Sequence, residues 1–274
     1  MMKQITTVLA AALAMACSDS DGMFDPPQAD ELADVEATAD SAAVLQFGRS
    51  HGGHANVRRN YGRWHDRGRA REYEITITNL ATGQPLSPGV IVTHNKWASF
   101  FSVGDAASDG LRFIAESGDP STAETELMDT RGVDGIVATM APIHRVGGPG
   151  PTSLTTTITA RGSANRFSLA VMLICTNDGF VGLDGVRLPN GFKPRTYYAP
   201  GYDAGTELND ETSLNVVDGC AAIGPVGGDA DGNGHVAEGG VVRLHPGIQG
   251  GAFLDPALHD WIDPVARVTV RRIK

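Results

Sequence analysis

Cysteine, aromatic residues and long apolar runs are all scarce in this chain of 274 residues. Aromatic residues make up 6% of the chain and no RNA-binding aromatic motif occurs, which together with a net charge of -10 argues against nucleic acid as a partner. The sequence contains no Walker loop and no paired Cys-x-x-Cys pattern for zinc. It also lacks Gly-x-Ser-x-Gly and His-Glu-x-x-His motifs, so we predict that it is not an enzyme.

Glycine and turn-forming residues are abundant instead. The chain has 34 Gly and 15 Pro, and its hydrophobic content of 41% is sufficient for a core. This composition favours short strands joined by many turns over long helices.

The N-terminus has the layout of an export signal. A lysine precedes an apolar run from Ile5 to Ala16, which is too short to span a membrane and ends in a small-x-small cleavage pattern. Cys17 follows at once and is a candidate for lipid modification, although Leu13 lies one position too early for a standard bacterial lipobox. We therefore predict a signal peptide over residues 1–17 and an exported protein, either secreted or a lipoprotein of the cell surface or outer membrane.

Residues 18–71 are predicted to be a disordered linker. Up to Leu45 the segment is acidic and contains no Lys or Arg, whereas Gln46 to Arg71 carries seven arginines and three histidines. The basic part is interpreted as a solvated linker, with a patch for anionic glycans or phospholipid headgroups as the alternative.

Residues 72–274 have the pattern of a mostly β domain. "REYEITITNL" alternates apolar and polar side chains, and "RFSLAVMLICT" is almost continuously apolar, as in a central strand. "SDGLRFIAESGD" and "PSTAETELMDT" have helical spacing, with Asp109 as a candidate cap and Gly118 as the stop of the first helix. The absence of alternating βαβ units predicts an antiparallel β-sandwich with two short helices.

Two cysteines remain in this domain if Cys17 is removed or lipidated. In an oxidising compartment an even pair favours a disulfide, so Cys175 and Cys220 are predicted to be bridged. The alternative is that both are small buried apolar residues.

Four segments between residues 72 and 274 form an ordered set: "SDGLRFIAESGD", "NDGFVGLDGVRL", "YDAGTE" and "PVARVTVRRI". In this order they resemble the motifs of the spondin N-terminal domain family. The resemblance implies a C2-like β-sandwich that holds Ca²⁺ through loop carboxylates at one end. It also implies a non-catalytic role in adhesion or in recognition of glycans outside the cell.

The resemblance assigns two calcium ligands to this chain, Asp178 and Asp203. The family's third ligand is a Glu on the strand before the apolar one, and that Glu is missing here. Thr159, or its neighbour Thr157, is the candidate at about that place, and Asp184 and Glu207 are candidates to compensate. The alternative is that these aspartates order turns without a metal.

A second loop begins like an EF-hand. Its candidate ligands are Asp229, Asp231, Asn233 and His235. Position 12 is Gly240 instead of the bidentate Glu, and the nearest acid, Glu238, is at position 10. The segment is therefore either a weak second calcium site or a Gly/Asp-rich hairpin loop.

These observations predict an exported, calcium-binding recognition module for a glycan or protein ligand. The alternative is a calcium-dependent, C2-like binder of phospholipid surfaces, and a hydrolase is a more remote possibility. The membrane alternative depends on whether six residues lie at loop tips near the calcium ligands or pack internally: Phe180, Phe192, Lys193, Arg195, Tyr197 and Tyr198.

Overall fold

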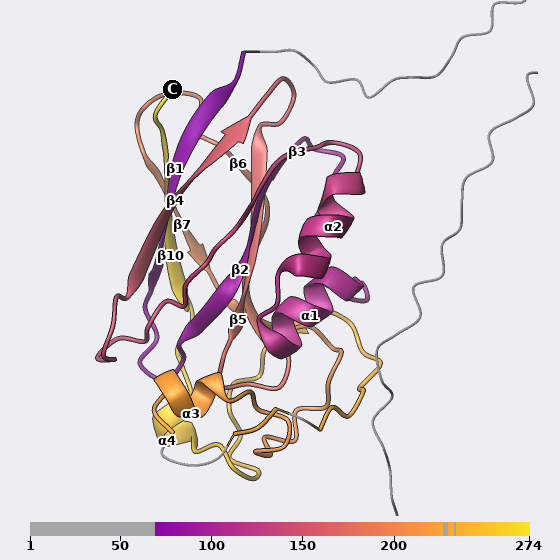
Figure 1. Ribbon diagram of the computed structural model, residues 1–274, viewed down its shortest axis with the longest axis vertical. Helices are drawn as coiled ribbons and strands as arrows, with labels where there is room; N and C mark the ends of the chain where they lie inside the picture. Colours follow the sequence, from indigo (N-terminus) through magenta and orange to yellow (C-terminus); the bar gives the residue numbers. More distant parts are fainter. Residues whose placement is uncertain (1–68, 227–229, 233) are drawn as a thin grey trace, which may run out of the picture. The chain divides into compact units, whose positions relative to one another are not determined.

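A computed structural model describes residues 69–226, 230–232 and 234–274, which form two antiparallel β-sheets with four short helices (Figure 1). The predicted signal peptide, Cys17 and nearly all of the predicted linker lie outside the described residues. Within the part of the chain that the structure describes, no helix is long and apolar enough to cross a membrane.

The first sheet has four strands in the order β4-β1-β10-β7. Each neighbouring pair is antiparallel. Its strands are β1 (Arg71–Asn79), β4 (Ser153–Ala160), β7 (Arg195–Ala199) and β10 (Ala266–Arg272).

The second sheet has six strands in the order β3-β2-β5-β6-β8-β9. Its strands are β2 (Leu86–His94), β3 (Val133–Ala138), β5 (Arg166–Leu173), β6 (Gly179–Arg187), β8 (Gly201–Asp203) and β9 (Arg243–Leu244). The predicted antiparallel sandwich is confirmed.

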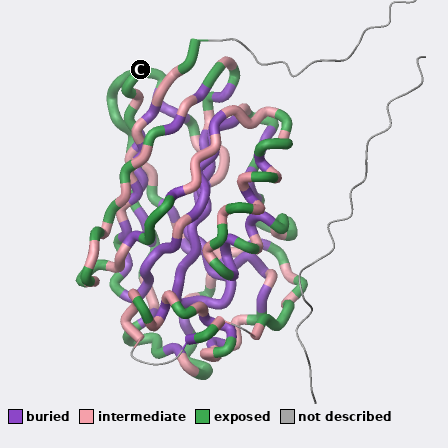
Figure 2. Tube along the Cα trace, in the orientation of Figure 1, coloured by how far each residue is buried: buried purple, intermediate pink, exposed green. Residues whose placement is uncertain are grey.

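The main core lies between the two sheets. Tyr73, Ile75 and Ile77 of β1 are fully buried and alternate with less buried residues, as the period of two predicted. They pack with Leu169 and Val171 of β5 from the other sheet. Burial of each large aliphatic side chain contributes about 1.5–3 kcal/mol to stability. Figure 2 shows the buried residues concentrated along the strands.

Strand β5 is buried on both faces because two helices cover the outer face of its sheet. These are α1 (Asp109–Ser117) and α2 (Ser121–Asp129) (Figure 1). Their apolar side chains form a second core with Ala170 of β5 and Phe180 of β6. This arrangement explains why "RFSLAVMLICT" is apolar without alternation.

The prediction that Asp109 caps α1 is wrong. The N-cap is Ser108, whose hydroxyl accepts a hydrogen bond from the N–H of Leu111, while Asp109 is the first helical residue. The predicted stop at Gly118 is confirmed, since this residue adopts a left-handed conformation with φ of 68°.

Two further helices, beyond the two predicted, lie at the end of the sandwich where β5 ends. They are α3 (Gly219–Ile223) and α4 (Pro256–His259). The predicted disulfide is confirmed: Cys175, just after β5, is bonded to Cys220 of α3 within a third apolar cluster.

Strand β9 is much shorter than "GGVVRLHP" indicated. Only Arg243 and Leu244 pair with β8. The backbone N–H groups just before them bond to loops instead: Gly240 to the carbonyl of Gly205, and Val242 to that of Asp105. The segment is thus held by several loops and not by one ladder.

Candidate metal centre

Asp178 is positioned by the tight turn between β5 and β6. The hydroxyl of Thr176 donates to the carbonyl of Leu173 at 2.6 Å and accepts the N–H of Gly179 at 2.9 Å, which closes the turn. Gly179 then begins β6 and pairs with Asp203, the last residue of β8. Because of this pairing, the two predicted ligands lie side by side at one end of the six-stranded sheet.

The Asp178 carboxylate is completely buried and only half satisfied. Its Oδ2 accepts the N–H groups of Thr206 and Glu207 at 2.7 and 3.1 Å, and the Thr206 hydroxyl at 3.2 Å. Its Oδ1 has no hydrogen-bond partner among the described residues. Burial, and secondarily the charge of Asp203, raise the pKa of Asp178 to about 6.

Asp203 is equally buried and fully hydrogen-bonded. Its Oδ1 accepts the N–H of Gly205 at 2.7 Å, and its Oδ2 accepts from Asn209 at 2.6 Å and from Arg243 at 2.9 Å. Gly205 has a φ of 70°, and a Cβ there would lie 2.5 Å from the backbone nitrogen of Val241. A glycine is therefore required for this loop to pack against the segment before β9.

Glu238 completes a group of three carboxylates that sequence reasoning did not assemble. One carboxylate oxygen from each of Asp178, Asp203 and Glu238 can be chosen so that all three lie within 4.8 Å of one another. The backbone places Glu238 there, because its N–H donates to the carbonyl of Thr206. The only sequence signal was the acidic, glycine-rich composition of its loop.

Arg243 is the counter-ion of this group. Its Nη2 lies 2.9 Å from Asp203 Oδ2 and 2.7 Å from Glu238 Oε1. Three carboxylates and one guanidinium leave a net formal charge of about -2 when all are ionised, which matches a divalent cation. The cluster therefore has the charge and the oxygen donors that Ca²⁺ prefers, and the Oδ1 of Asp178 is available.

Glu207 adjoins the cluster, but its side chain is directed to His235. Its Oε2 lies 3.0 Å from His235 Nδ1, and its Oε1 has no partner within the described part of the chain. Burial raises the pKa of Glu207 to about 7, partly offset by the hydrogen bond with His235. Glu207 touches Asp178 through its backbone N–H.

The EF-like loop does not form a separate ring of ligands among its described residues. His235 contacts Glu207, while the backbone N–H of Asp231 bonds to the carbonyl of Ser213. The other two candidates, Asp229 and Asn233, lie outside the described residues. The described part of this loop thus attaches to the end of the sandwich that carries Asp178.

The structure does not bring Thr159 to the cluster. Thr159 belongs to β4 of the four-stranded sheet, where it pairs with Glu72 of β1. It lies near the end where β5 begins, whereas Asp178 follows the end of β5, and eight residues of strand span about 26 Å.

Asp184 is also occupied elsewhere. Its carboxylate accepts hydrogen bonds from the Phe100 N–H at 2.8 Å and from the hydroxyls of Ser99 and Ser168 at 2.9 and 2.7 Å. It fixes the segment after β2 against β6, which favours the turn-ordering alternative for this residue.

Comparison with known proteins identifies one family. The family model described as Spondin_N matches residues 62–212, more than half of the chain. This stretch contains Asp178, Asp203 and Glu207 and ends before Glu238 and Arg243. A search of curated proteins finds no match.

Proposed function

Because the chain belongs to the spondin N-terminal domain family, we propose that it is an exported, calcium-dependent recognition module. The family consists of non-catalytic recognition domains built as extracellular-type β-sandwiches. In this proposal Ca²⁺ binds at Asp178, Asp203 and Glu238, and the domain engages a glycan or protein ligand outside the cell. Lipidated Cys17 anchors the module to the membrane, or the protein is secreted.

One observation carries the calcium proposal: the buried Oδ1 of Asp178 has no partner among the described residues. A buried carboxylate oxygen without a hydrogen bond is costly in free energy, because water no longer solvates it. A cation next to Asp203 and Glu238 would remove this cost and hold all three carboxylates ionised.

Calcium in this position would organise loops and not perform chemistry. The Asp178 carboxylate accepts hydrogen bonds from backbone N–H groups of the loop that begins at Thr206, and Glu238 belongs to the loop before β9. A bound cation therefore ties two long connections to the end of β5. Such ordered loops are the usual place for ligand recognition on a rigid sandwich.

The position of the apolar and basic residues counts against the phospholipid alternative. Phe180 is buried in the second core, whereas Phe192, with 66% of its surface exposed, and Lys193 lie in the connection after β6. That connection starts where β6 ends, nearly the length of the strand away from Asp178. Calcium at Asp178 would not bring these side chains to the same membrane surface.

Thermal unfolding with excess calcium and with excess EDTA tests the metal site. A ligand that binds only the folded state stabilises it and so raises the melting temperature. The gain in stability is about 2.7 kcal/mol when the free calcium concentration is 100 times Kd. We expect this rise for wild type and for Asp129→Asn, an exposed matched control, and its loss in Asp178→Asn. An equal midpoint for wild type under both conditions would contradict the proposal.

Ligand recognition needs a separate experiment. The purified protein is applied to a glycan array with calcium and with EDTA, using Asp178→Asn as the control. Calcium-dependent binding to a defined set of glycans that the variant loses would support the proposal. If every glycan that binds does so equally in EDTA and in the variant, the dependence of recognition on this metal site is refuted.

A further inference from the structure

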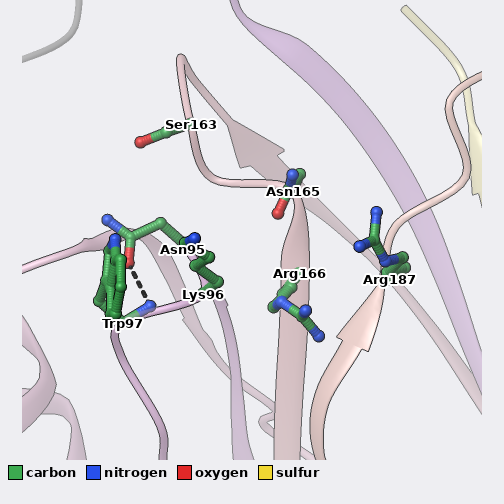
Figure 3. A pocket seen from close by; sticks show the side chains of 7 residues that line it. All are labelled: Asn95, Lys96, Trp97, Ser163, Asn165, Arg166 and Arg187. Carbon is green, nitrogen blue, oxygen red and sulfur yellow. Dashed lines mark hydrogen bonds between the residues drawn. The ribbon is translucent and has the colours of Figure 1, made fainter.

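A second polar site lies at the opposite end of the six-stranded sheet. It is an open pocket of about 400 Å³, within the range of roughly 300–1,000 Å³ that is typical of small-molecule sites. Its walls come from the turn after β2, from the β4–β5 connection and from the facing ends of β5 and β6 (Figure 3). Since β6 begins next to Asp178 and ends here, the pocket is separate from the carboxylate cluster.

The pocket presents a tryptophan that the fold leaves exposed. Trp97 exposes 81% of its surface, yet its backbone is fixed because its N–H donates to Asn95 Oδ1 at 2.8 Å. The Asn95 N–H in turn donates to the carbonyl of Gly132 at 2.9 Å. A large aromatic ring stabilises a fold most when it is buried. A ring that is instead held in solvent on a hydrogen-bonded turn is a feature of binding surfaces.

The pocket is also strongly basic in a protein of net charge -10. Lys96, Arg166 and Arg187 line it, and none of the three forms an ion pair within the described residues 69–226, 230–232 and 234–274. Lys96 Nζ lies 4.4 Å from the centre of the Trp97 ring.

The two arginines face each other directly across the strands. Arg166 of β5 and Arg187 of β6 are register partners, and like charges in that position destabilise a sheet. The Arg166 guanidinium donates to the carbonyl of Gly185. At Arg187 the Tyr197 hydroxyl donates to the backbone carbonyl, whereas the side chain makes no hydrogen bond to another described residue. A bound anion would relieve the repulsion and satisfy the free donors.

We infer that this pocket binds an acidic saccharide. The face of the Trp97 ring that Lys96 does not cover offers a flat apolar surface to the C–H face of a sugar ring, and Figure 3 places the two guanidinium groups on the other side of the pocket. Arginine forks suit a carboxylate or sulfate, and the amides of Asn95 and Asn165 provide donors and acceptors for hydroxyl groups. Charge repulsion from the rest of the protein disfavours a long nucleic acid.

This inference adds a second glycan site to the calcium-dependent recognition proposed above; it rests on that proposal in taking a glycan as the ligand, but it does not require calcium. The carboxylate cluster and the pocket lie at opposite ends of β6, so binding at the pocket is expected in EDTA as well. The two proposals therefore fail separately. A missing calcium-induced rise in melting temperature would contradict the metal site, and missing saccharide binding would contradict the assignment of this pocket.

Titration of the full chain with three hexasaccharides tests the inference. The probes are an oligogalacturonate, a heparin-derived hexasaccharide and neutral maltohexaose, followed by calorimetry and by tryptophan fluorescence, with calcium and with EDTA. We expect one or both acidic probes to bind at least about tenfold more tightly than the neutral probe, with a fluorescence change; the better probe distinguishes carboxylate from sulfate.

Variants locate the binding in the pocket. Arg187→Ala and Trp97→Ala should each weaken the acidic probe by about tenfold. Arg267→Ala removes the same charge from an exposed position on the other sheet, and Met140→Ala shortens another exposed apolar side chain; both should leave affinity within about twofold. Circular dichroism establishes that each variant is folded.

Four results would overturn the inference. Three come from the titrations above: equal affinity for acidic and neutral probes, an equal loss in Arg187→Ala and Arg267→Ala, or an unchanged affinity in Trp97→Ala. The fourth comes from a further titration with an oligothymidylate, if it binds more tightly than either acidic saccharide. If any of these results is found while calcium still raises the melting temperature, the metal site stands and only the assignment of this pocket fails.

Discussion

One oxygen of Asp178 fixes the start of the loop at Thr206. The Oδ2 atom accepts the Thr206 N–H at 2.7 Å and its hydroxyl at 3.2 Å, while the Oδ1 atom of the same carboxylate has no partner among the described residues. The two oxygens therefore have different roles. One joins two connections that are 28 residues apart in sequence, and the other is the atom that the proposed calcium ion would contact.

The first prediction concerns stability without metal. The pKa of Asp178 is about 6 in the folded protein and 3.8 as its ordinary value, so the folded state binds the proton more tightly. Its contribution to stability is complete below about pH 4 and is lost as the pH rises through 6, a change of up to about 3 kcal/mol. Denaturant unfolding in EDTA between pH 4 and 7 measures it.

Asp178→Asn is the control for this pH dependence, because an amide does not titrate. Three other groups also change with pH: burial raises the pKa of Glu207 to about 7, lowers that of His245 to about 4 and lowers that of His259. The two histidines oppose Glu207 in their effect on stability, and all three groups are present in both proteins, so the difference between wild type and variant isolates Asp178. An identical slope in the two proteins would show that Asp178 is not protonated in this range.

The second prediction concerns the disulfide between Cys175 and Cys220. It closes a loop with a sequence separation of 45 residues and lies three residues before Asp178. Replacing both cysteines with Ala should lower the free energy of unfolding by about 2–4 kcal/mol. The free energy of calcium binding should change by less than the free energy of unfolding. Gln84 independently holds the backbone of Cys175, with hydrogen bonds of 2.9 Å at both its N–H and its carbonyl.

Dithiothreitol provides the control for the disulfide. Reduced wild type should match the double variant in stability, and the reductant should not change the variant further. If wild type has the same stability with and without reductant, the bond makes no contribution under those conditions.

Patterns in the sequence predicted the parts of this structure that depend on local periodicity or on pairing along one strand. The alternation in β1 predicted its buried face, and the motifs around Asp178 and Asp203 predicted that these two residues converge. Glu238 could not be placed in this way. Its position depends on backbone bonds between irregular loops, such as that from its N–H to Thr206, and no sequence period reports such bonds.

The candidate Thr159 failed for a different reason. It was chosen by its order along the chain, but β4 crosses to the other sheet and pairs with β1, so the residue lies at the far end of the sandwich. The position of a residue along the chain does not specify at which end of a sheet it lies. The cap of α1 was misplaced by one residue, which is the usual uncertainty of a helix boundary.

The third prediction tests that cap. Ser108→Ala should cost about 1 kcal/mol of stability, because the Leu111 N–H loses its acceptor. Asp109→Ala should cost only a few tenths of a kcal/mol, since Asp109 is exposed and pairs with Arg112 at 3.3 Å on the helix surface. Thermal unfolding of the two variants decides between the residues, and a larger loss in Asp109→Ala would contradict the assignment.

The last prediction concerns Arg243, the internal cation of the carboxylate cluster. In the metal-free protein it neutralises part of the charge of Asp203 and Glu238, so Arg243→Gln should lower stability in EDTA by about 1–3 kcal/mol. The same change takes the net formal charge of the cluster from about -2 to about -3, so calcium should bind about tenfold more tightly. Arg267→Gln, on the other sheet, should alter neither quantity.

Calorimetric titration with calcium measures the affinity. Weaker binding in Arg243→Gln would mean that the guanidinium positions the carboxylates for the ion, instead of competing with it for the same oxygens.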